Sequence, residues 1–406
     1  MDGFEIYEIT MGFRIARLTD VLAGRKPERI PFIDRMDFWQ RGLSWQDMLP
    51  NGYTGMSLEQ VHQALGFGML EWKYPYSYRY KNLELLIERD GELISREFEP
   101  EIFDFPSLWD DLPIDQPGTY TTTAISPAGR LTCEHRMTEE GLRAGISRAI
   151  MSSHPVSSPA DCAVFAAMIE NSELIPKFEP FRQRSEQLQG FGFLTPKLSR
   201  APFQALLIDV FGETSLFYAL YDYPRQVEGL LRLLDERMQD LLERLSGLPV
   251  PYVEMIDNLE GRMTNPRLFR KYLLPTYQEY ARILHGQGKK LGSHLDGDLK
   301  PLLGLLAECG LDVCESFTPA PITGCAFEDA WHAWADGPLI WGGIPSYYLE
   351  PGVPEDEFKG YVEKVLGYAS QRPIILGIGD AVMAEDQIER LAWIVERVEE
   401  TPVNWD

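Results

Sequence analysis

A histidine and an aspartate two residues apart, His294 and Asp296, form the clearest chemical pattern in this 406-residue sequence. They lie at the end of the stretch 289–295, whose composition predicts a β-strand. Two side chains at this spacing on an extended chain point to the same side. A neutral imidazole and a carboxylate that face one cavity can bind Zn²⁺ or a related ion, with a third ligand from another strand. The pair therefore predicts a metal site.

Asp380 is the third metal ligand that we expect, and Glu315 is the second choice. Asp380 follows the last predicted strand, and a closed barrel brings the end of that strand round to the others. Glu315 lies at the end of another predicted strand. Two alternatives stay open: Asp296 could orient His294 instead of binding an ion, and the nearby Asp298 could cap the following helix.

Asp257 and Glu315 are candidate acids that face the substrate, together with His294. Asp257 ends the predicted strand 251–257, where a carboxylate could act as a general base or bind a substrate hydroxyl or amine. An ion pair with Arg262 or Arg267 is an equally good interpretation of Asp257.

All these residues end strands in the second half of the chain, where strands and helices alternate. The predicted strands are 251–257, 289–295, 311–317, 339–343 and 373–378. The predicted helices are 265–285, 299–308, 327–335, 355–370 and 385–398. This alternation predicts an α/β fold with a parallel sheet. A closed barrel is favoured over an open sheet, because no G-x-G-x-x-G turn follows an early strand, and barrels carry their chemistry at the C-terminal ends of the strands.

The first half of the chain is less regular. A strand is expected at 30–36, followed by a hairpin over 83–98 with its turn at Asp90-Gly91 and a second hairpin over 119–136. These hairpins form either a structural cap or a lid over a cleft. A helical pattern covers 160–186, and Asp222 is expected to cap a helix that runs to residue 245.

The composition excludes several classes of function. The formal net charge of −24 argues against a nucleic-acid partner and against adhesion to anionic membranes. No apolar run is long enough to span a bilayer, and the first residues are acidic, unlike a secretory signal. The 5 scattered cysteines are typical of reduced thiols, so a cytoplasmic location is expected.

Several segments in order resemble the uroporphyrinogen decarboxylase superfamily. They are 22–31, Asp257-Asn258, Asn265–Phe269, Leu274–Tyr277, His294–Asp298, Trp341–Ile344 and Leu376–Asp380. The resemblance implies a modified (β/α)8 TIM-type barrel with an elaborated N-terminal region of hairpins and helices. It also implies a single domain over 1–406, with the elaborated part at about 1–160 and the main barrel at about 190–406.

The superfamily contains two chemistries. True uroporphyrinogen decarboxylases use no metal, and an arginine-bearing N-terminal segment holds their polycarboxylate porphyrinogen. The corresponding stretch here, 34–42, carries two acids, Asp34 and Asp37, and the net charge of −24 fits a polyanionic substrate poorly. The sequence is more similar to the other branch, the methylcobamide:coenzyme M methyltransferases and related corrinoid-linked enzymes.

Those methyltransferases bind zinc through a His-x-Cys pair and a later Cys. The matching positions here are His294, Asp296 and Asp380, so carboxylates replace both thiolates. Such a harder site suits polarisation of an ether or alcohol oxygen. The resemblance therefore implies a metal-assisted methyltransferase that demethylates a small methylated or methoxylated compound. Its methyl group would pass to or from a corrinoid supplied by a separate protein, and relatives suggest a homodimer.

Two alternatives remain from different classes. A cofactor-independent decarboxylase would use Asp257 or Asp296 to stabilise a protonated intermediate and His294 to donate a proton. A non-catalytic barrel would bind a tetrapyrrole or cobamide as a carrier.

Overall fold

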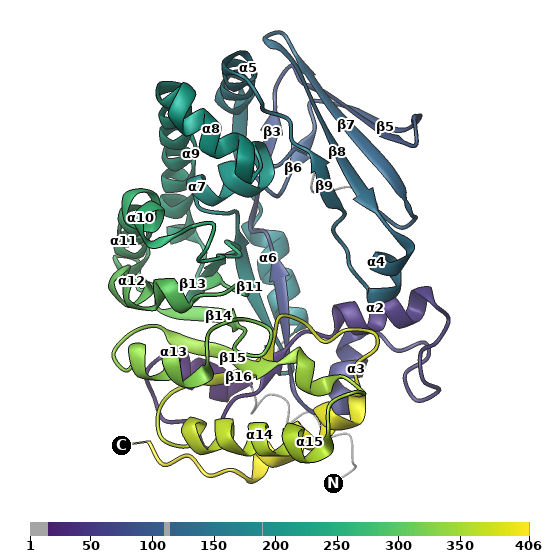
Figure 1. Cartoon of the computed structure of the whole chain (residues 1–406), viewed down its shortest axis with the longest axis vertical. Helices are drawn as coiled ribbons and strands as arrows, with labels where there is room; N and C mark the ends of the chain where they lie inside the picture. The colour runs from purple at the N-terminus through teal and green to yellow at the C-terminus, as the bar shows by residue number, and fades with distance from the viewer. Residues whose placement is uncertain (1–14, 109–113, 189, 406) are drawn as a thin grey trace.

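A computed structural model describes residues 15–108, 114–188 and 190–405 (Figure 1). The acidic first residues, considered above for a secretory signal, lie outside this range. An 8-stranded parallel sheet forms the centre, in the order β1-β2-β11-β12-β13-β14-β15-β16. Its strands are Ile33–Asp34, Gly68–Lys73, Gly192–Leu198, Tyr252–Met255, Lys290–His294, Val313–Phe317, Leu339–Pro345 and Ile375–Gly379. The five strands predicted in the second half are all confirmed, and so is the barrel.

The last and first strands close the barrel through few contacts. Phe32 and Leu376 form an isolated parallel bridge, and the Leu376 N–H donates to the Pro31 carbonyl at 2.9 Å. Beyond this bridge a side chain replaces the backbone ladder, because the Asp34 carboxylate accepts hydrogen bonds from the N–H groups of Ile378 and Arg35. Asp34 therefore ties β1 to β16 just below the strand ends.

The interior of the barrel is layered. Side chains two residues apart on a strand point to the same face. Tyr252, Val313, Trp341 and Ile375 share one apolar cluster in the barrel. Gly292 leaves room for the Tyr252 ring, since a Cβ there would lie 1.9 Å from the tyrosine oxygen. Two residues further along their strands come Glu254, His294 and Glu315, so a polar layer lies above the apolar one.

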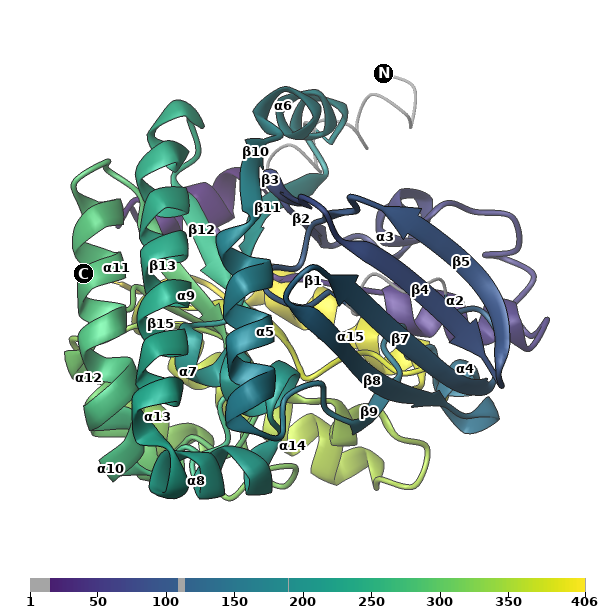
Figure 2. The same ribbon diagram turned by 90° about the horizontal axis from the view of Figure 1, so that it is seen from above.

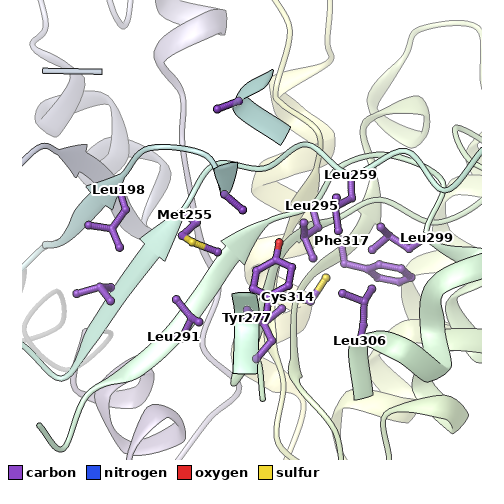
Figure 3. Close-up of a cluster of buried hydrophobic side chains, with 14 of the residues drawn as sticks. Leu198, Met255, Leu259, Tyr277, Leu291, Leu295, Leu299, Leu306, Cys314 and Phe317 are labelled. Atoms are coloured by element: carbon purple, nitrogen blue, oxygen red, sulfur yellow. The ribbon is translucent and has the colours of Figure 1, made fainter. Parts of the chain in front are cut away.

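The outer core lies between the strands and the helices that cover them. Figure 3 shows strand residues Leu198, Met255 and Leu291 in one buried cluster with Tyr277 and Leu306, which come from helices α11 and α12. The helices of this half are α7 Pro202–Ala205, α8 Glu213–Asp222, α9 Pro224–Arg244, α10 Pro266–Leu268, α11 Leu274–His285, α12 Leu303–Glu308, α13 Phe327–Ala333, α14 Glu355–Ala369 and α15 Ile388–Glu400.

Two details of these helices differ from expectation or refine it. Asp222 does not cap α9, because it is the last residue of α8, and the residue before Pro224 is Tyr223, which makes no side-chain cap bond. The helix expected at 265–285 begins at the cap Asn265, as predicted, and a π-helical turn over Phe269–Leu273 precedes Pro275.

No single helix of the described segments is long and apolar enough to cross a membrane. The bent pair Pro202–Val210 and Glu213–Asp222 meets that criterion when its two helices are taken together, by length and composition only.

The N-terminal region adds two small antiparallel sheets. One has the order β5-β4-β7-β8-β9, with bounds Glu92–Phe98, Glu84–Arg89, Gly118–Ser126, Gly129–Met137 and Ile150–Ser153. Both predicted hairpins are confirmed here, and Asp90 and Gly91 take the positive φ values of 51° and 86° that a tight two-residue turn requires. The other sheet has the order β10-β3-β6, with bounds Ser172–Pro176, Tyr76–Tyr80 and Glu101–Ile102.

The helical prediction for 160–186 is wrong in its middle. Helix α5, Pro159–Glu170, is followed by strand β10 and then by helix α6, Phe178–Gln187. Strand β10 pairs with β3 from Ser172 to Pro176, so a partner distant in sequence overrides the local helical pattern. Helix α5 lies between α9 and the five-stranded sheet (Figure 2). The remaining N-terminal helices are α2 Asp37–Trp45, α3 Leu58–Leu65 and α4 Glu139–Ala144.

We expect the Asp34 closure to be sensitive to pH. Burial raises the pKa of Asp34 from 3.8 to about 7. Between these values the folded chain holds a proton that the unfolded chain releases, so the contribution of Asp34 to the unfolding free energy falls as the pH rises. Asp34→Asn does not titrate. The unfolding free energy of Asp34→Asn, measured relative to that of the unmodified chain, should therefore rise by on the order of 2–4 kcal/mol from pH 4.5 to pH 7.5.

Urea unfolding at several pH values measures this difference. Asp356→Asn, at an exposed carboxylate in the first turn of α14, is the matched control and should show no such change. A gap between Asp34→Asn and the unmodified chain that stays constant across the window would contradict the assignment.

Candidate active site

A cavity of about 560 Å³ opens at the C-terminal ends of the barrel strands. Six of the strand ends contribute lining side chains: Arg35, Trp72, Lys197, Asn258, His294 and Asp380. Asp104, Ser147 and Arg148 from the N-terminal region also line it, so that region forms part of the cavity wall. A volume of this size suits a small organic molecule.

His294 is the last residue of β13, and each of its ring nitrogens faces a carboxylate. Nδ1 lies 2.5 Å from Glu315 Oε2, and Nε2 lies 3.5 Å from Asp296 Oδ2. The edge of the imidazole also meets the Trp72 ring, with centroids 5.0 Å apart. These three neighbours fix the ring plane. Nδ1 faces the buried Glu315, and Nε2 faces Asp296, which lines the cavity.

Asp296 is held by a residue that sequence reasoning passed over. Asn258 Nδ2 donates to both carboxylate oxygens of Asp296, at 2.9 and 2.8 Å. Asn258 is itself fixed, because Arg200 donates to its Oδ1 at 2.6 Å and its backbone N–H donates to the His294 carbonyl at 3.0 Å. Its position next to Asp257, directly after a predicted strand, is the feature of the sequence that could have identified Asn258 as a site residue.

Asp257 does not face the cavity, which corrects the expectation that it contacts substrate. It is fully buried, and its carboxylate accepts hydrogen bonds from the Ala201 N–H at 2.7 Å, the Tyr277 hydroxyl at 2.5 Å and the Ser293 hydroxyl at 3.2 Å. Asn258 takes a left-handed φ of 46°, and Asn258 rather than Asp257 lines the cavity. Asp257 therefore ties β12 to α7 and α11. Its bonds do not involve Arg262 or Arg267.

Asp380 lies where the sequence predicted, beside His294 and Asp296. Its φ is 74°, and its backbone N–H donates to Ser316 Oγ at 3.2 Å, so the end of β16 is fastened to the end of β14. Burial raises the pKa of Asp380, and the charge of Asp296 raises it further. The structure thus brings all three expected metal ligands to one cavity. Asp298 lies one residue before Leu299, the N-cap of the short helix Lys300–Leu302, and its Oδ1 accepts the Lys300 N–H at 3.1 Å.

Glu315 and Glu254 form a buried carboxylate pair behind His294. Glu254, which sequence reasoning missed, is fully buried and accepts a hydrogen bond from the Tyr252 hydroxyl at 3.1 Å. Burial and the neighbouring Glu315 raise the pKa of Glu254 well above its usual value. The buried surroundings and the charge of Glu315 thus favour the neutral form of Glu254. An acid inside an otherwise apolar strand is the signal that could have found it.

The neighbouring negative charges affect the pKa of His294 more strongly than its burial does. Burial alone would lower the pKa of His294, but the charges of Glu315 and Asp296 raise it to about 10. Burial would likewise raise the pKa of Asp296, but its contacts with His294 and Asn258 hold that pKa well below the usual range. The neighbouring Glu315 and Asp296 thus favour the protonated form of His294.

Two sets of side chains near His294 could hold a metal ion. On the inner side, ligand atoms of Glu254, His294 and Glu315 lie within 4.8 Å of one another, and all three residues are buried. On the cavity side, His294 Nε2 lies 3.5 Å from Asp296 Oδ2, and Asp380 lines the same cavity. Oxygen and imidazole ligands of either kind suit Zn²⁺ and harder divalent ions.

Glu315→Gln tests the cause of the raised pKa. The change keeps the side-chain shape but removes the charge, so the pKa of His294 should fall towards its usual range in the metal-free protein. The stability from this pairing is complete below about pH 6.5 and is lost as the pH rises through about 10. NMR titration of the imidazole proton, assigned with His294→Gln, measures the change. An unchanged pKa in Glu315→Gln would show that Glu315 is not its cause.

Comparison with known proteins agrees with this architecture. Residues 200–401 match the sequence model of the family Uroporphyrinogen decarboxylase (URO-D). The chain is similar to the solved structure of a methyltransferase from Methanosarcina mazei, with a TM-score of 0.50 and 17% identity over 66% of this chain and 75% of that one. A mandelate racemase/muconate lactonizing enzyme-like protein from Rubrobacter xylanophilus, at 16% identity over 79% of each chain, has a TM-score of 0.25, which is too low to indicate a shared fold. The comparison with curated proteins gives no match. The chain belongs to the uroporphyrinogen decarboxylase superfamily.

Proposed function

We propose that this protein is a metal-assisted methyltransferase that demethylates a small methylated or methoxylated compound. The methyl group passes to or from the corrinoid of a separate protein. The observation that carries the proposal is the pair His294 Nε2 and Asp296 Oδ2, which lie 3.5 Å apart at the cavity. The fold shared with a methyltransferase from Methanosarcina mazei supports the same class of reaction. The expected homodimer stays a prediction.

The distances favour the cavity side of His294 over its inner side as the place for an ion. Two ligand atoms at about 2.1 Å from a tetrahedral ion lie roughly 3.4 Å apart. His294 Nε2 and Asp296 Oδ2 are at 3.5 Å, so an ion fits between them with little movement. His294 Nδ1 and Glu315 Oε2 are at 2.5 Å, which is a hydrogen bond with no room for an ion. We therefore assign His294, Asp296 and Asp380 as the ligands.

The remaining residues prepare these ligands. Glu315 accepts a hydrogen bond from Nδ1–H, so that the Nε2 lone pair of a neutral His294 is directed at the cavity, as carboxylates behind metal-binding histidines commonly do. Asn258 donates to both oxygens of Asp296 and sets the orientation of that carboxylate. Glu315 is thus a positioning residue. The role that we assign to Asp257 is structural, since it holds β12 against α7 and α11.

The reaction that we propose breaks the bond between the methyl carbon and its oxygen, and the electron pair stays on that oxygen. A Co(I) corrinoid of the partner protein would accept the methyl group and would supply the electron pair for the new carbon–cobalt bond. A bound metal ion would act as a Lewis acid that makes the oxygen a better leaving group. The chain's own part is to hold the substrate oxygen beside Asp296 and His294 and to keep bulk water away from it.

A cofactor-independent decarboxylase is the second candidate, and one observation favours it. In the metal-free protein His294 is protonated, with a pKa of about 10, and its Nε2 faces Asp296 at the cavity. A protonated imidazole there could deliver a proton to the carbon that loses carbon dioxide. Metal dependence separates the two candidates, because only the methyltransferase needs an ion.

Methyl transfer can be measured with free cob(I)alamin and a panel of small methoxylated compounds. The Zn²⁺-loaded protein should form methylcobalamin, which absorbs differently from cob(I)alamin. His294→Ala and Asp296→Asn should lower the rate at least about 100-fold, because each removes an ion ligand.

Asp298→Asn is the matched control for this experiment. It lies two residues from Asp296, and the oxygen of an asparagine can still accept the Lys300 N–H, so this variant should keep the rate. Activity that survives both removal of the ion and the His294→Ala change would contradict the proposal. Release of carbon dioxide by the metal-free protein would favour the decarboxylase.

A further inference from the structure

Arg200 is a buried cation behind the candidate active site. It lies two residues after β11, and 9% of its surface is exposed, while its partner Asp209 is 6% exposed. Its Nε donates to the Asp209 carboxylate at 3.2 Å. Of the described residues, the cavity lining includes Asn258 but not Arg200. A buried ion pair adds little net stability, because both charges lose their hydration, so stability alone does not explain this one.

The guanidinium of Arg200 holds the end of β12. One nitrogen, Nη1, donates to the Ile256 carbonyl and to Asn258 Oδ1, the latter at 2.6 Å. The Asn258 N–H donates to the His294 carbonyl at 3.0 Å, which fixes the backbone of Asn258 at its φ of 46°. The orientation of the side-chain amide remains to be set, since half a turn about its last bond exchanges the oxygen and the NH₂ group.

The amide of Asn258 lies between a group that only donates hydrogen bonds and a group that only accepts them. The guanidinium of Arg200 has no acceptor, and an ionised carboxylate has no donor. With Oδ1 towards Arg200 and Nδ2 towards Asp296, every contact is a hydrogen bond, and Nδ2 reaches both oxygens of Asp296. The reverse orientation would place donor against donor and acceptor against acceptor. Arg200 therefore excludes it.

We infer that Arg200 is a positioning residue for metal binding. By fixing which end of Asn258 faces Asp296, it keeps that carboxylate oriented towards an ion beside His294 Nε2. The inference rests on the proposed function for the ion at Asp296. Arg200 acts through Asn258 and touches neither the ion nor the substrate. Without Arg200 the amide can turn, and its oxygen then repels the carboxylate that Nδ2 now holds.

Exchange of the Asn258 amide protons with water, followed by NMR in the metal-free protein and assigned with Asn258→Ala, tests the orientation. The exchange should be slow in the unmodified protein. Arg200→Gln should speed it at least about 10-fold, because glutamine accepts as well as donates and so permits the orientation in which the bond to a charged acceptor is lost. Arg200→Lys should keep the exchange slow, because lysine also only donates.

Binding of Zn²⁺ alone, measured by competition with a chelator, tests the consequence for the ion. Arg200→Gln should weaken binding about 10- to 100-fold, as the loss of a group that orients a metal ligand commonly does, and Arg200→Lys should restore it. The loss of a nearby positive charge would by itself strengthen the binding of a cation. Weaker binding in Arg200→Gln therefore identifies a loss of orientation and not of charge.

Arg390→Gln is the matched control and should change neither measurement. Arg390 is similarly buried, at 6% exposed, and its guanidinium also donates to backbone carbonyls, those of Tyr348, Glu350 and Val353. None of these four is among the described residues that line the cavity. A general effect of removing a buried arginine would appear in this variant as well.

Fast exchange in the unmodified protein would overturn the inference, whether or not the variants fold. So would an Arg200→Gln protein that keeps the unmodified Zn²⁺ affinity, or an Arg200→Lys protein that behaves like Arg200→Gln. The proposed function can fail separately. A Zn²⁺ affinity that falls in Arg200→Gln and returns in Arg200→Lys, in a chain that transfers no methyl group, would keep the inference and remove the function. Methyl transfer by a chain whose Zn²⁺ affinity does not depend on Arg200 would do the reverse.

Discussion

The site depends on the contact between His294 Nδ1 and Glu315 Oε2, at 2.5 Å. The backbone maintains this contact, because His294 and Glu315 are paired in the register of the parallel strands β13 and β14. Glu254 on β12 supports Glu315 from the other side and is held by Tyr252. With Nδ1 occupied in this way, Nε2 is the nitrogen that remains for the cavity. The direction of this imidazole therefore follows from strand register.

The barrel turns this local constraint into a site. Its apolar layer around Tyr252 and Trp341 fills the lower interior, and the polar layer lies above it at the strand ends. Asp34 closes the sheet between β1 and β16, and so brings Arg35 and Asp380 to neighbouring places on the rim. The N-terminal region contributes Asp104 and Arg148 to the wall. Residues far apart in sequence thus meet around one cavity, where we propose that His294, Asp296 and Asp380 hold a metal ion.

Much of this arrangement could be predicted, because its signals are local. Alternating strands and helices predict the barrel, and Asp90-Gly91 predicts a tight turn. His294 and Asp380 could be expected at the cavity because His294 ends a strand and Asp380 follows one. The backbone conformation of Asn258 could not be read from residue types, so Asp257 was placed in the cavity in its stead. The helical pattern of 160–186 is interrupted because β10 pairs with β3, and the local sequence gives no sign of this distant partner. Trp72 and Lys197 escaped notice because their strands lie outside the regular alternation.

The most direct test of the account is a crystal structure of the Zn²⁺-loaded protein with anomalous scattering recorded at the zinc edge. The account predicts one strong peak on the cavity side of the imidazole, about 2.1 Å from His294 Nε2 and within bonding distance of Asp296 and Asp380. Glu315 should remain hydrogen-bonded to Nδ1. A peak between Glu254 and Glu315 on the inner side, or no peak near His294 at saturating zinc, would contradict it.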